Sequence, residues 1–353
     1  MPSPPACMAQ DVALAPYTTM GLGGAARWFA HCTSIGELGE SLRFARNGGL
    51  PLQVFSGGSN IIFADEGFDG VVIHVALRGL SENLSADEAV IEAAAGEPWD
   101  RVVVHAVERG WGGIECLSGI PGSAGGTPVQ NVGAYGQEVG QTILSVRAID
   151  RLTLEEAEFS REACAFGYRL SRFKGPDADR YIITGVRFRL KRHFEPDVRY
   201  PELARALGEN HGPEAGGTTP GTVRAAVLAL RRKKSMVIDP ADENSRSVGS
   251  FFTNPVVPES FLQEKLKGVP VPTYPAPGGI KLSAAWLVEH AGFPKGFRMK
   301  GAGISDRHAL AIVNRGGSTE DVMALEGEIR KQVYAKFGIR LEREPVVVPY
   351  RPG

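Results

Sequence analysis

The sequence predicts an α+β protein built from two or three domains. The chain has 353 residues, and a chain longer than about 250–300 residues usually divides into more than one hydrophobic core. Short β-rich runs separated by glycine-rich turns dominate its first half, whereas helical patterns become prominent from about residue 200. The two halves therefore favour different local structures.

In the first half, β-branched and aromatic residues gather in short runs that predict strands. The segment 51–80 contains three of them, "LQVF", "NIIF" and "VVIHV", and a fourth, "AVIEAAAG", occupies 89–96. We expect a helix at 97–110, because Pro98 suits its first position and Gly110 suits its C-terminal cap. Two further strands are expected in "TILSVRAID" and "RYIITGVRFRLKR".

In the second half, the patterns predict helices at 217–235, 281–292 and 318–338. The last of them has apolar residues at spacings of three and four, namely Val322, Leu325, Ile329 and Val333. An acidic first turn and the terminal Gly338 fit the two ends of that helix. A final β-rich run, "IRLEREPVVVPY", follows it.

Composition and charge exclude several classes of protein. A chain that is 43% hydrophobic and 22% charged is typical of globular proteins. The formal net charge of -1 argues against nucleic-acid binding, which usually needs a basic face. The sequence shows no apolar run of about 18 residues and no signal-peptide pattern. We therefore expect a cytoplasmic protein with neither a nucleic-acid nor a membrane partner.

The cysteines and histidines predict no metal site. The four cysteines are far apart and form no CxxC pair, and the seven histidines form no HExxH motif. Such scattered cysteines are typical of free thiols in a reducing compartment.

The segment "GLGGAA" at 21–26 matches the G-x-G-x-x-G/A pattern of dinucleotide-binding βαβ units. That motif needs a strand before it and a helix after it. Here "APYTTM" before it is not a strand, and "RWFAHCTS" after it is a poor helix. We therefore do not assign a Rossmann site.

Two other glycine-rich segments remain. "SGGSN" at 56–60 lies between two expected strands, so it is either a hairpin turn or a nest of N–H groups for a diphosphate. "GIPGSAGGTPVQNVGAYG" at 119–136 has six glycines, two prolines and no charged side chain. Glycine permits close approach of the backbone to another group. Together the two segments favour one long ligand touched twice, and a flavin dinucleotide is the natural candidate.

Five segments occur in the order found in a known family: "SGGSNIIFADEGFDGVVI", "GIPGSAGGTPVQNVGAYG", "FGYRLSRFK", "VGSFFTNP" and "LERE". From about Thr18 to Val348 the chain resembles the UDP-N-acetylenolpyruvoylglucosamine reductases of bacterial peptidoglycan precursor synthesis. The segment "FEPDVRYPELARAL" is similar to the substrate-covering loop of the longer form of these enzymes, with Tyr200 as its tyrosine.

The resemblance implies a vanillyl-alcohol-oxidase-type (PCMH-type) FAD-binding fold in two subdomains, followed by a C-terminal α+β substrate-binding domain. Residues 1–78, joined by a C-terminal strand at 346–353, would form the first subdomain, 79–235 the second and 236–345 the substrate domain. It also implies a monomer that binds FAD non-covalently, since Asn60 offers no histidine tether, and that uses NADPH as reductant. NADPH and a nucleotide-sugar substrate would occupy one site in turn.

The resemblance assigns cofactor contacts to both glycine-rich segments. These residues are Ser56, Gly57, Gly58, Ser59, Asn60, Ile120, Pro121, Gly122, Ser123, Gly125, Gly126, Gln130, Asn131, Gly133, Ala134 and Tyr135.

Three catalytic residues follow from the same resemblance. Arg169 would stabilise the substrate carboxylate, Ser250 would donate a proton to carbon, and Glu344 would orient or share a proton with the developing dianion. The residues alone instead indicate a solvated loop cation at Arg169 and a turn or cap residue at Ser250. In an extended "IRLERE" both Glu342 and Glu344 fall on one face, so spacing does not choose between them; the family pattern favours Glu344.

Substrate contacts are expected from Tyr168, Tyr200, Lys234, Asn254 and His308. Lys234 also has a simpler explanation, because cations at a helix C-terminus complement the helix dipole. His308 is explained as well by a hydrogen bond to backbone. Two other functions stay open: a flavin oxidase of the same fold that acts on an alcohol or sugar, and a regulatory nucleotide-binding protein without turnover.

Overall fold

The computed structural model describes residues 3–210 and 217–349. Its N-terminal part is a four-stranded sheet in the order β1-β2-β5-β3. The strands are β1 (Met8–Ala13), β2 (Ala25–Cys32), β3 (Leu52–Phe55) and β5 (Phe68–Val75). β1 and β2 pair antiparallel, whereas β2 and β3 both pair parallel with β5. The segment 21–26 therefore leads into a strand, which agrees with rejecting it as a Rossmann motif.

Helix α1 (Ile35–Asn47) packs against this sheet and is not among the expected helices. It begins with a capping box: the Glu37 N–H donates to the Ser34 hydroxyl, and the Ser34 N–H donates to the Glu37 carboxylate. This reciprocal pair satisfies two N–H groups at the helix start. The spacing of Ser34 and Glu37 is the signal that the sequence offered for α1.

A five-stranded antiparallel sheet of order β11-β10-β12-β7-β6 forms the second part. Its strands are β6 (Leu80–Leu84), β7 (Glu88–Ala94), β10 (Ile143–Asp150), β11 (Glu156–Ser160) and β12 (Tyr181–Lys191). Helix α2 (Trp99–Glu108) buries Trp99 against Phe188 of β12, with ring centroids 5.5 Å apart. The core of this part is continuous with the core under α1.

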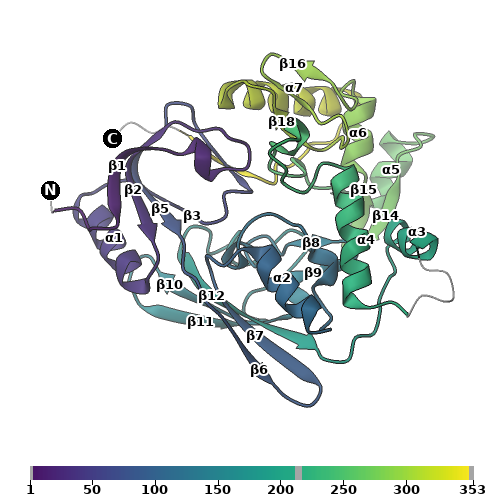
Figure 1. Ribbon diagram of the computed structural model, residues 1–353. Coiled ribbons are helices and arrows are strands. Elements are labelled where there is room, and N and C mark those ends of the chain that lie inside the picture. Colours follow the sequence, from purple (N-terminus) through teal and green to yellow (C-terminus); the bar gives the residue numbers. More distant parts are fainter. Residues whose placement is uncertain (1–2, 211–216, 350–353) are drawn as a thin grey trace.

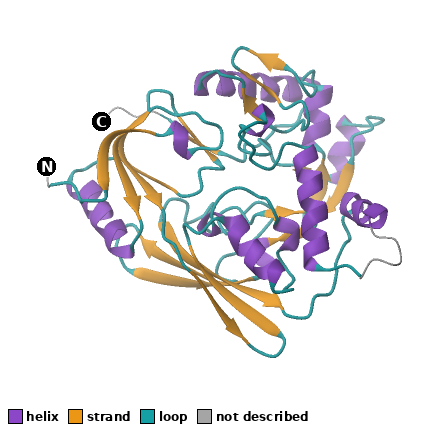
Figure 2. Cartoon of the chain, viewed as in Figure 1, coloured by secondary structure: helices purple, strands orange, loops and turns teal. Residues whose placement is uncertain are grey.

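The C-terminal part holds most of the remaining helices, as Figure 2 shows. Its main elements are α3 (Pro201–Asn210), α4 (Pro220–Lys233), β13 (Val256–Val257), α5 (Glu259–Lys265), β14 (Thr273–Ala276), β15 (Gly279–Leu282), α6 (Ala284–His290), β16 (Arg298–Met299), β17 (Ala302–Ile304), β18 (Ile312–Asn314) and α7 (Thr319–Phe337). The predicted stripe of α7 is buried, and Gly338 ends the helix with φ of 68°. Helices α5, α6 and α7 pack around a separate hydrophobic core, whereas α3 and α4 share a smaller core with Cys116.

The chain finally returns to its N-terminal part. Strand β19 (Val346–Val348) pairs parallel with β4 (Ile61–Phe63). The expected joining strand is thus present, although residues 350–353 of the expected range lie outside the described residues.

Two expected elements differ in extent. The helix expected at 281–292 begins only at Ala284, because Gly279–Leu282 form β15 and the Ser283 hydroxyl caps α6 by accepting from the Trp286 N–H. The last β-rich run contributes a strand only at Val346–Val348. Pro345 lacks an N–H to donate to a ladder.

Candidate active site

The loop 56–60 crosses between two sheets. It connects β3, which belongs to the four-stranded sheet, to β4, which pairs with β19. The hairpin alternative for this segment is therefore wrong. Gly58 has φ of 61°, and a Cβ there would lie 1.8 Å from the Tyr17 carbonyl oxygen, so only glycine fits.

The two glycine-rich segments touch each other. A Cβ on Gly57 would lie 2.4 Å from the Cα of Gly122. The Ser59 hydroxyl donates to the Pro121 carbonyl at 3.0 Å. Segments separated by about sixty residues in the sequence thus form one continuous wall.

This wall borders a cleft of about 650 Å³, a volume within the range of small-molecule and cofactor sites. Of the sixteen residues expected to contact the cofactor, fifteen line the cleft and Asn131 does not. Arg169, Ser250 and Glu344 all line it, as do Tyr200, Lys234 and His308.

The glycine-rich wall fits a flavin dinucleotide. It carries no charged side chain, so its backbone can approach an uncharged ring system closely. The hydroxyl oxygen of Ser123 lies in the lining, is buried, and has no hydrogen-bond partner. A buried hydroxyl without a partner costs free energy, and a bound cofactor would supply one. Ser56–Asn60 and the backbone near Gly122 are the groups that would hold it.

Arg169 and Glu344 form an ion pair in the cleft, with Arg169 Nε 3.3 Å from Glu344 Oε1. The Arg169 guanidinium also donates to the Gly133 carbonyl at 2.8 Å. Its position is fixed by a residue of the second glycine-rich segment and by a carboxylate from the far end of the sequence.

A backbone bridge brings Ser250 and Glu344 into the same region. Phe252 and Arg343 form an isolated antiparallel bridge, and the Glu344 N–H donates to the Phe251 carbonyl at 2.9 Å. Glu344 lines the cleft, whereas Glu342 is exposed and does not. The geometry thus distinguishes two carboxylates that spacing alone left equivalent.

Glu344 has a perturbed acidity. Burial raises the pKa of its carboxyl group above the ordinary value, and the nearby cations Arg169 and Lys174 oppose that rise. Removing a carboxylate from water disfavours its charged form. Glu344 can therefore keep or share a proton more readily than an exposed glutamate.

A second group of cationic residues lines the cleft near α4. Lys234 follows α4, and its Nζ lies 5.7 Å from the centroid of the Tyr135 ring. Burial is the first cause that lowers the pKa of His308 to about 4, and the positive charges of Lys234 and Arg231 add to it. The Nδ1 of His308 accepts from the Leu310 N–H at 3.0 Å. His308 is therefore neutral near pH 7.

Arg231 is a site residue that the sequence analysis did not assign. It lines the cleft, is only 7% exposed, and its Nε has no hydrogen-bond partner. Burial lowers the pKa of its guanidinium to about 10. Arg231 comes four residues after Val227, on the apolar stripe of α4, and this spacing was the feature of the sequence that could have predicted its burial.

Tyr200 belongs to the segment that precedes α3. Its ring and the Tyr135 ring meet edge to face, with centroids 5.4 Å apart. Two residues later, Glu202 forms an ion pair of 2.6 Å with Lys234. The expected substrate-covering segment thus contacts both the second glycine-rich loop and the end of α4.

Three expected contacts do not line the cleft. The Asn131 amide donates to Glu138 and accepts from the Gly140 N–H, so it supports its own loop. The Asn254 side-chain oxygen accepts from the Ala284 N–H at the start of α6. Tyr168 packs its ring against Lys281 of β15, with Nζ 4.5 Å from the centroid.

Comparisons with known proteins agree with this arrangement. Residues 239–348 match the family described as UDP-N-acetylenolpyruvoylglucosamine reductase, C-terminal domain, and residues 26–152 match an FAD binding domain. The UDP-N-acetylenolpyruvoylglucosamine reductase of Thermobifida fusca is 46% identical over 352 residues, which cover 96% of this chain and 98% of the relative. The reductase of Mycobacterium tuberculosis strain H37Rv is 46% identical over 361 residues, covering 97% and 95%.

A solved structure is similar over nearly the same extent. The crystal structure of UDP-N-acetylenolpyruvylglucosamine reductase from Thermus caldophilus matches with a TM-score of 0.63 and 26% identity. The match covers 96% of this chain and 98% of that chain. The comparisons confirm the expected α+β fold, with an FAD-binding part followed by a C-terminal domain.

Proposed function

The chain belongs to the UDP-N-acetylenolpyruvoylglucosamine reductase family, and from that premise we propose that it reduces UDP-N-acetylglucosamine enolpyruvate to UDP-N-acetylmuramate. It is an FAD-dependent oxidoreductase, and NADPH is the reductant in this proposal. The observation that carries the proposal is that Arg169, Ser250 and Glu344 line the same cleft as both glycine-rich segments.

FAD, held by Ser56–Asn60 and the backbone near Gly122, would supply hydride to the terminal CH₂ of the enolpyruvyl group. Every other task in the reaction falls to groups of this chain. Negative charge develops on the neighbouring carbon and its carboxylate, so the chain must stabilise an anion and deliver a proton.

Arg169 is proposed to bind the substrate carboxylate. Its planar guanidinium matches two carboxylate oxygens. The ion pair with Glu344 and the hydrogen bond to the Gly133 carbonyl hold the Arg169 guanidinium in one orientation before the substrate binds. A cation fixed in advance stabilises the developing charge without reorganising during the reaction.

Glu344 is proposed to orient Arg169 and to share a proton with the developing dianion. Its raised pKa supports this role, because a carboxyl group that binds a proton readily can donate a hydrogen bond to an anion.

Ser250 is proposed to donate the proton to carbon. A serine hydroxyl is a weak acid, but protonation of a carbanion is strongly downhill, so geometry matters more than acidity. The position of Ser250 is supported by the adjacent backbone bond from the Phe251 N–H to the Leu310 carbonyl at 2.8 Å.

The diphosphate of the sugar nucleotide is proposed to bind at the cationic group near α4. Lys234 and the unpartnered Nε of Arg231 are the donors suited to phosphate oxygens. Tyr200 would cover the bound substrate from the α3 segment. The sequence offers no second dinucleotide fingerprint, which supports alternate occupation of one site by NADPH and the sugar nucleotide.

Anaerobic mixing tests the proposal. We expect NADPH to bleach the flavin absorption, and UDP-N-acetylglucosamine enolpyruvate, added afterwards, to restore it with formation of UDP-N-acetylmuramate. Bleaching by an alcohol or sugar, with recovery only on admission of oxygen, would instead establish an oxidase. A flavin that no reductant bleaches would favour a binding protein without turnover.

A further inference from the structure

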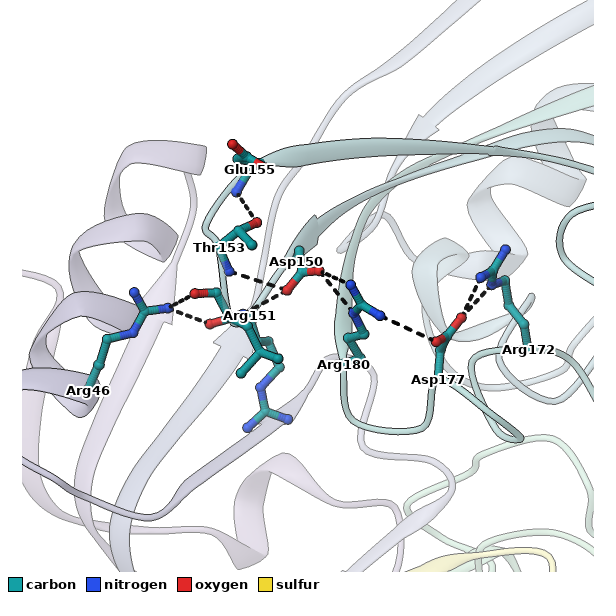
Figure 3. A network of polar contacts seen from close by, with 9 residues as sticks. Arg46, Asp150, Arg151, Thr153, Glu155, Arg172, Asp177 and Arg180 are labelled. Carbon is teal, nitrogen blue, oxygen red and sulfur yellow. Dashed lines mark hydrogen bonds and ion pairs between the residues drawn. The ribbon is translucent and has the colours of Figure 1, made fainter.

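Arg151 lines the cleft where β3 and α1 border it: its guanidinium donates to the Leu52 carbonyl, and its own carbonyl accepts from Arg46. It follows β10 directly, next to α1, whereas Ser250 belongs to the C-terminal part. Figure 1 shows α1 and the C-terminal helices on opposite sides of the molecule. The Arg46 guanidinium of α1 donates to the Arg151 and Leu152 carbonyls, each at 2.7 Å (Figure 3).

The side chain of Arg151 connects two parts of the fold. Its Nη1 donates to the Asp179 carbonyl at 2.6 Å, and its Nη2 donates to the Leu52 carbonyl at 3.2 Å. Leu52 belongs to β3, and β3 leads into the loop at Ser56. The guanidinium therefore connects β3, the strand before the loop 56–60, to the segment that precedes β12.

Arg151 borders two cavities. Arg151, Ala178 and Asp179 line both the cleft and a second cavity of about 440 Å³, which Leu42, Leu50 and Arg180 also border. Arg151 therefore lies where the two spaces adjoin.

Burial lowers the pKa of the Arg151 guanidinium and the nearby charge of Asp179 opposes that change, but the two side chains form no direct ion pair. The hydrogen bonds of Arg151 go to main-chain carbonyls, and no salt bridge within residues 3–210 and 217–349 includes it. In Figure 3 its guanidinium points away from the chain of ion pairs between Asp150, Arg180 and Asp177. A guanidinium has five N–H donors, so donors remain for a ligand.

We propose that Arg151 binds the adenosine monophosphate half of FAD and so selects FAD over FMN. This rests on the proposed function, in which the isoalloxazine ring lies beside Arg169, Ser250 and Glu344. The loop 56–60 and Arg151 line the same cleft, so the other half of the dinucleotide would lie within reach of Arg151. FMN lacks that half and would not depend on Arg151. The residue therefore acts on cofactor choice and not on the reacting atoms.

The test compares Arg151→Ala with Arg46→Ala in the full chain. Arg46 is a matched control, because it also bonds carbonyls across the same boundary but borders only the second cavity. The FAD-loaded protein is diluted serially, and released flavin is followed by its fluorescence. The same measurement is made on protein loaded with FMN.

We expect Arg151→Ala to weaken FAD binding by about 10-fold to 100-fold, the usual effect of losing a hydrogen bond to a charged group. FMN binding should change by less than about 2-fold, and Arg46→Ala should alter neither. Equal weakening of FAD and FMN by Arg151→Ala, an unchanged FAD affinity, or the same loss in Arg46→Ala would each overturn the inference.

If Arg151→Ala does not fold, Arg151→Gln decides the question, because it can still donate to a carbonyl but has no charge. It should weaken FAD and spare FMN; equal affinities to the parent would overturn the proposal. The failure of the proposed function looks different, since wild-type protein that bound neither flavin would contradict the enzyme assignment itself.

Discussion

The Lys234 ammonium lies 2.6 Å from the Glu202 carboxylate, and this ion pair joins the end of α4 to the first turn of α3. Both side chains are about one-third exposed, so the pair contributes only about 0–1 kcal/mol. A phosphate group can therefore displace Glu202 at little cost. The same pair keeps Tyr200 and the end of α4 together before a ligand binds.

Glu202→Gln should tighten binding of the sugar nucleotide, because it removes a carboxylate that competes for Lys234. We expect the KM for the enolpyruvyl sugar to fall by about 2-fold to 5-fold with little change in kcat. Glu195→Gln is the control, since Glu195 is an exposed acid that pairs with Lys191 outside the cleft. A KM that stays the same or rises in Glu202→Gln would contradict this role.

Ser250→Ala should separate the two half-reactions. Loss of the proposed donor should slow reduction of the enolpyruvyl sugar by about 10²-fold to 10⁴-fold. FAD binding and flavin reduction by NADPH should be almost unchanged. Stopped-flow absorption measures both steps, and Thr253→Ala, in the same loop but outside the cleft lining, should leave both intact. If sugar reduction survived in Ser250→Ala, the donor assignment would be wrong.

Glu344→Gln should change how stability depends on pH. Because burial raises the pKa of Glu344, the folded chain keeps a proton that the unfolded chain releases above the ordinary pKa of 4.5. The free energy of unfolding then falls as pH rises from there through the raised pKa.

Glutamine at position 344 cannot titrate. The free energy of unfolding of Glu344→Gln, relative to that of wild type, should therefore grow as pH rises through that interval. Urea unfolding at a series of pH values measures the difference. Glu342→Gln, at an exposed position outside the cleft, serves as the control. A constant difference between Glu344→Gln and wild type across the series would refute the expectation.

His308→Gln should make the protein less sensitive to acid. The pKa of His308 is lowered from 6.5 to about 4, first by burial and then by Lys234. Between those values the unfolded chain binds a proton that the folded chain does not, so stability is full above 6.5 and falls as pH decreases.

The loss at low pH amounts to about 3 kcal/mol at most for His308. Burial also lowers the pKa of His74 to about 4, so the variant should lose only part of the acid sensitivity. Thermal unfolding between about pH 4 and pH 7 measures it. His193→Gln, at an exposed position, should behave as wild type; identical pH profiles for His308→Gln and wild type would contradict the prediction.

The sequence predicted those parts of the cleft whose backbone conformation depends on local composition. The two glycine-rich segments contain the positive φ angles and close approaches that only glycine allows, as at Gly57 and Gly58. Their composition therefore indicated a ligand wall before any contact was known. Family resemblance then selected Arg169 and Glu344, which the structure joins in an ion pair.

Local sequence motifs could not predict contacts between residues that are far apart in the chain. Asn131 and Asn254 fit the expected motifs, yet their amides bond to neighbouring backbone or to Glu138 away from the cleft. Arg231 was hidden because a cation near a helix end has an ordinary explanation in the helix dipole. Only the packing of α4 reveals that its Nε is buried without a partner.

The parallel pairing of β19 with β4 has a consequence for synthesis of the protein. Val346 bonds to the Asn60 carbonyl through its N–H at 2.9 Å, and Glu344 lies just two positions before it. During synthesis, the loop at Asn60 therefore lacks this partner until residues 346–348 have been added and have left the ribosome. A nascent chain that stopped before Glu344 would contain both glycine-rich segments but would lack the carboxylate that pairs with Arg169.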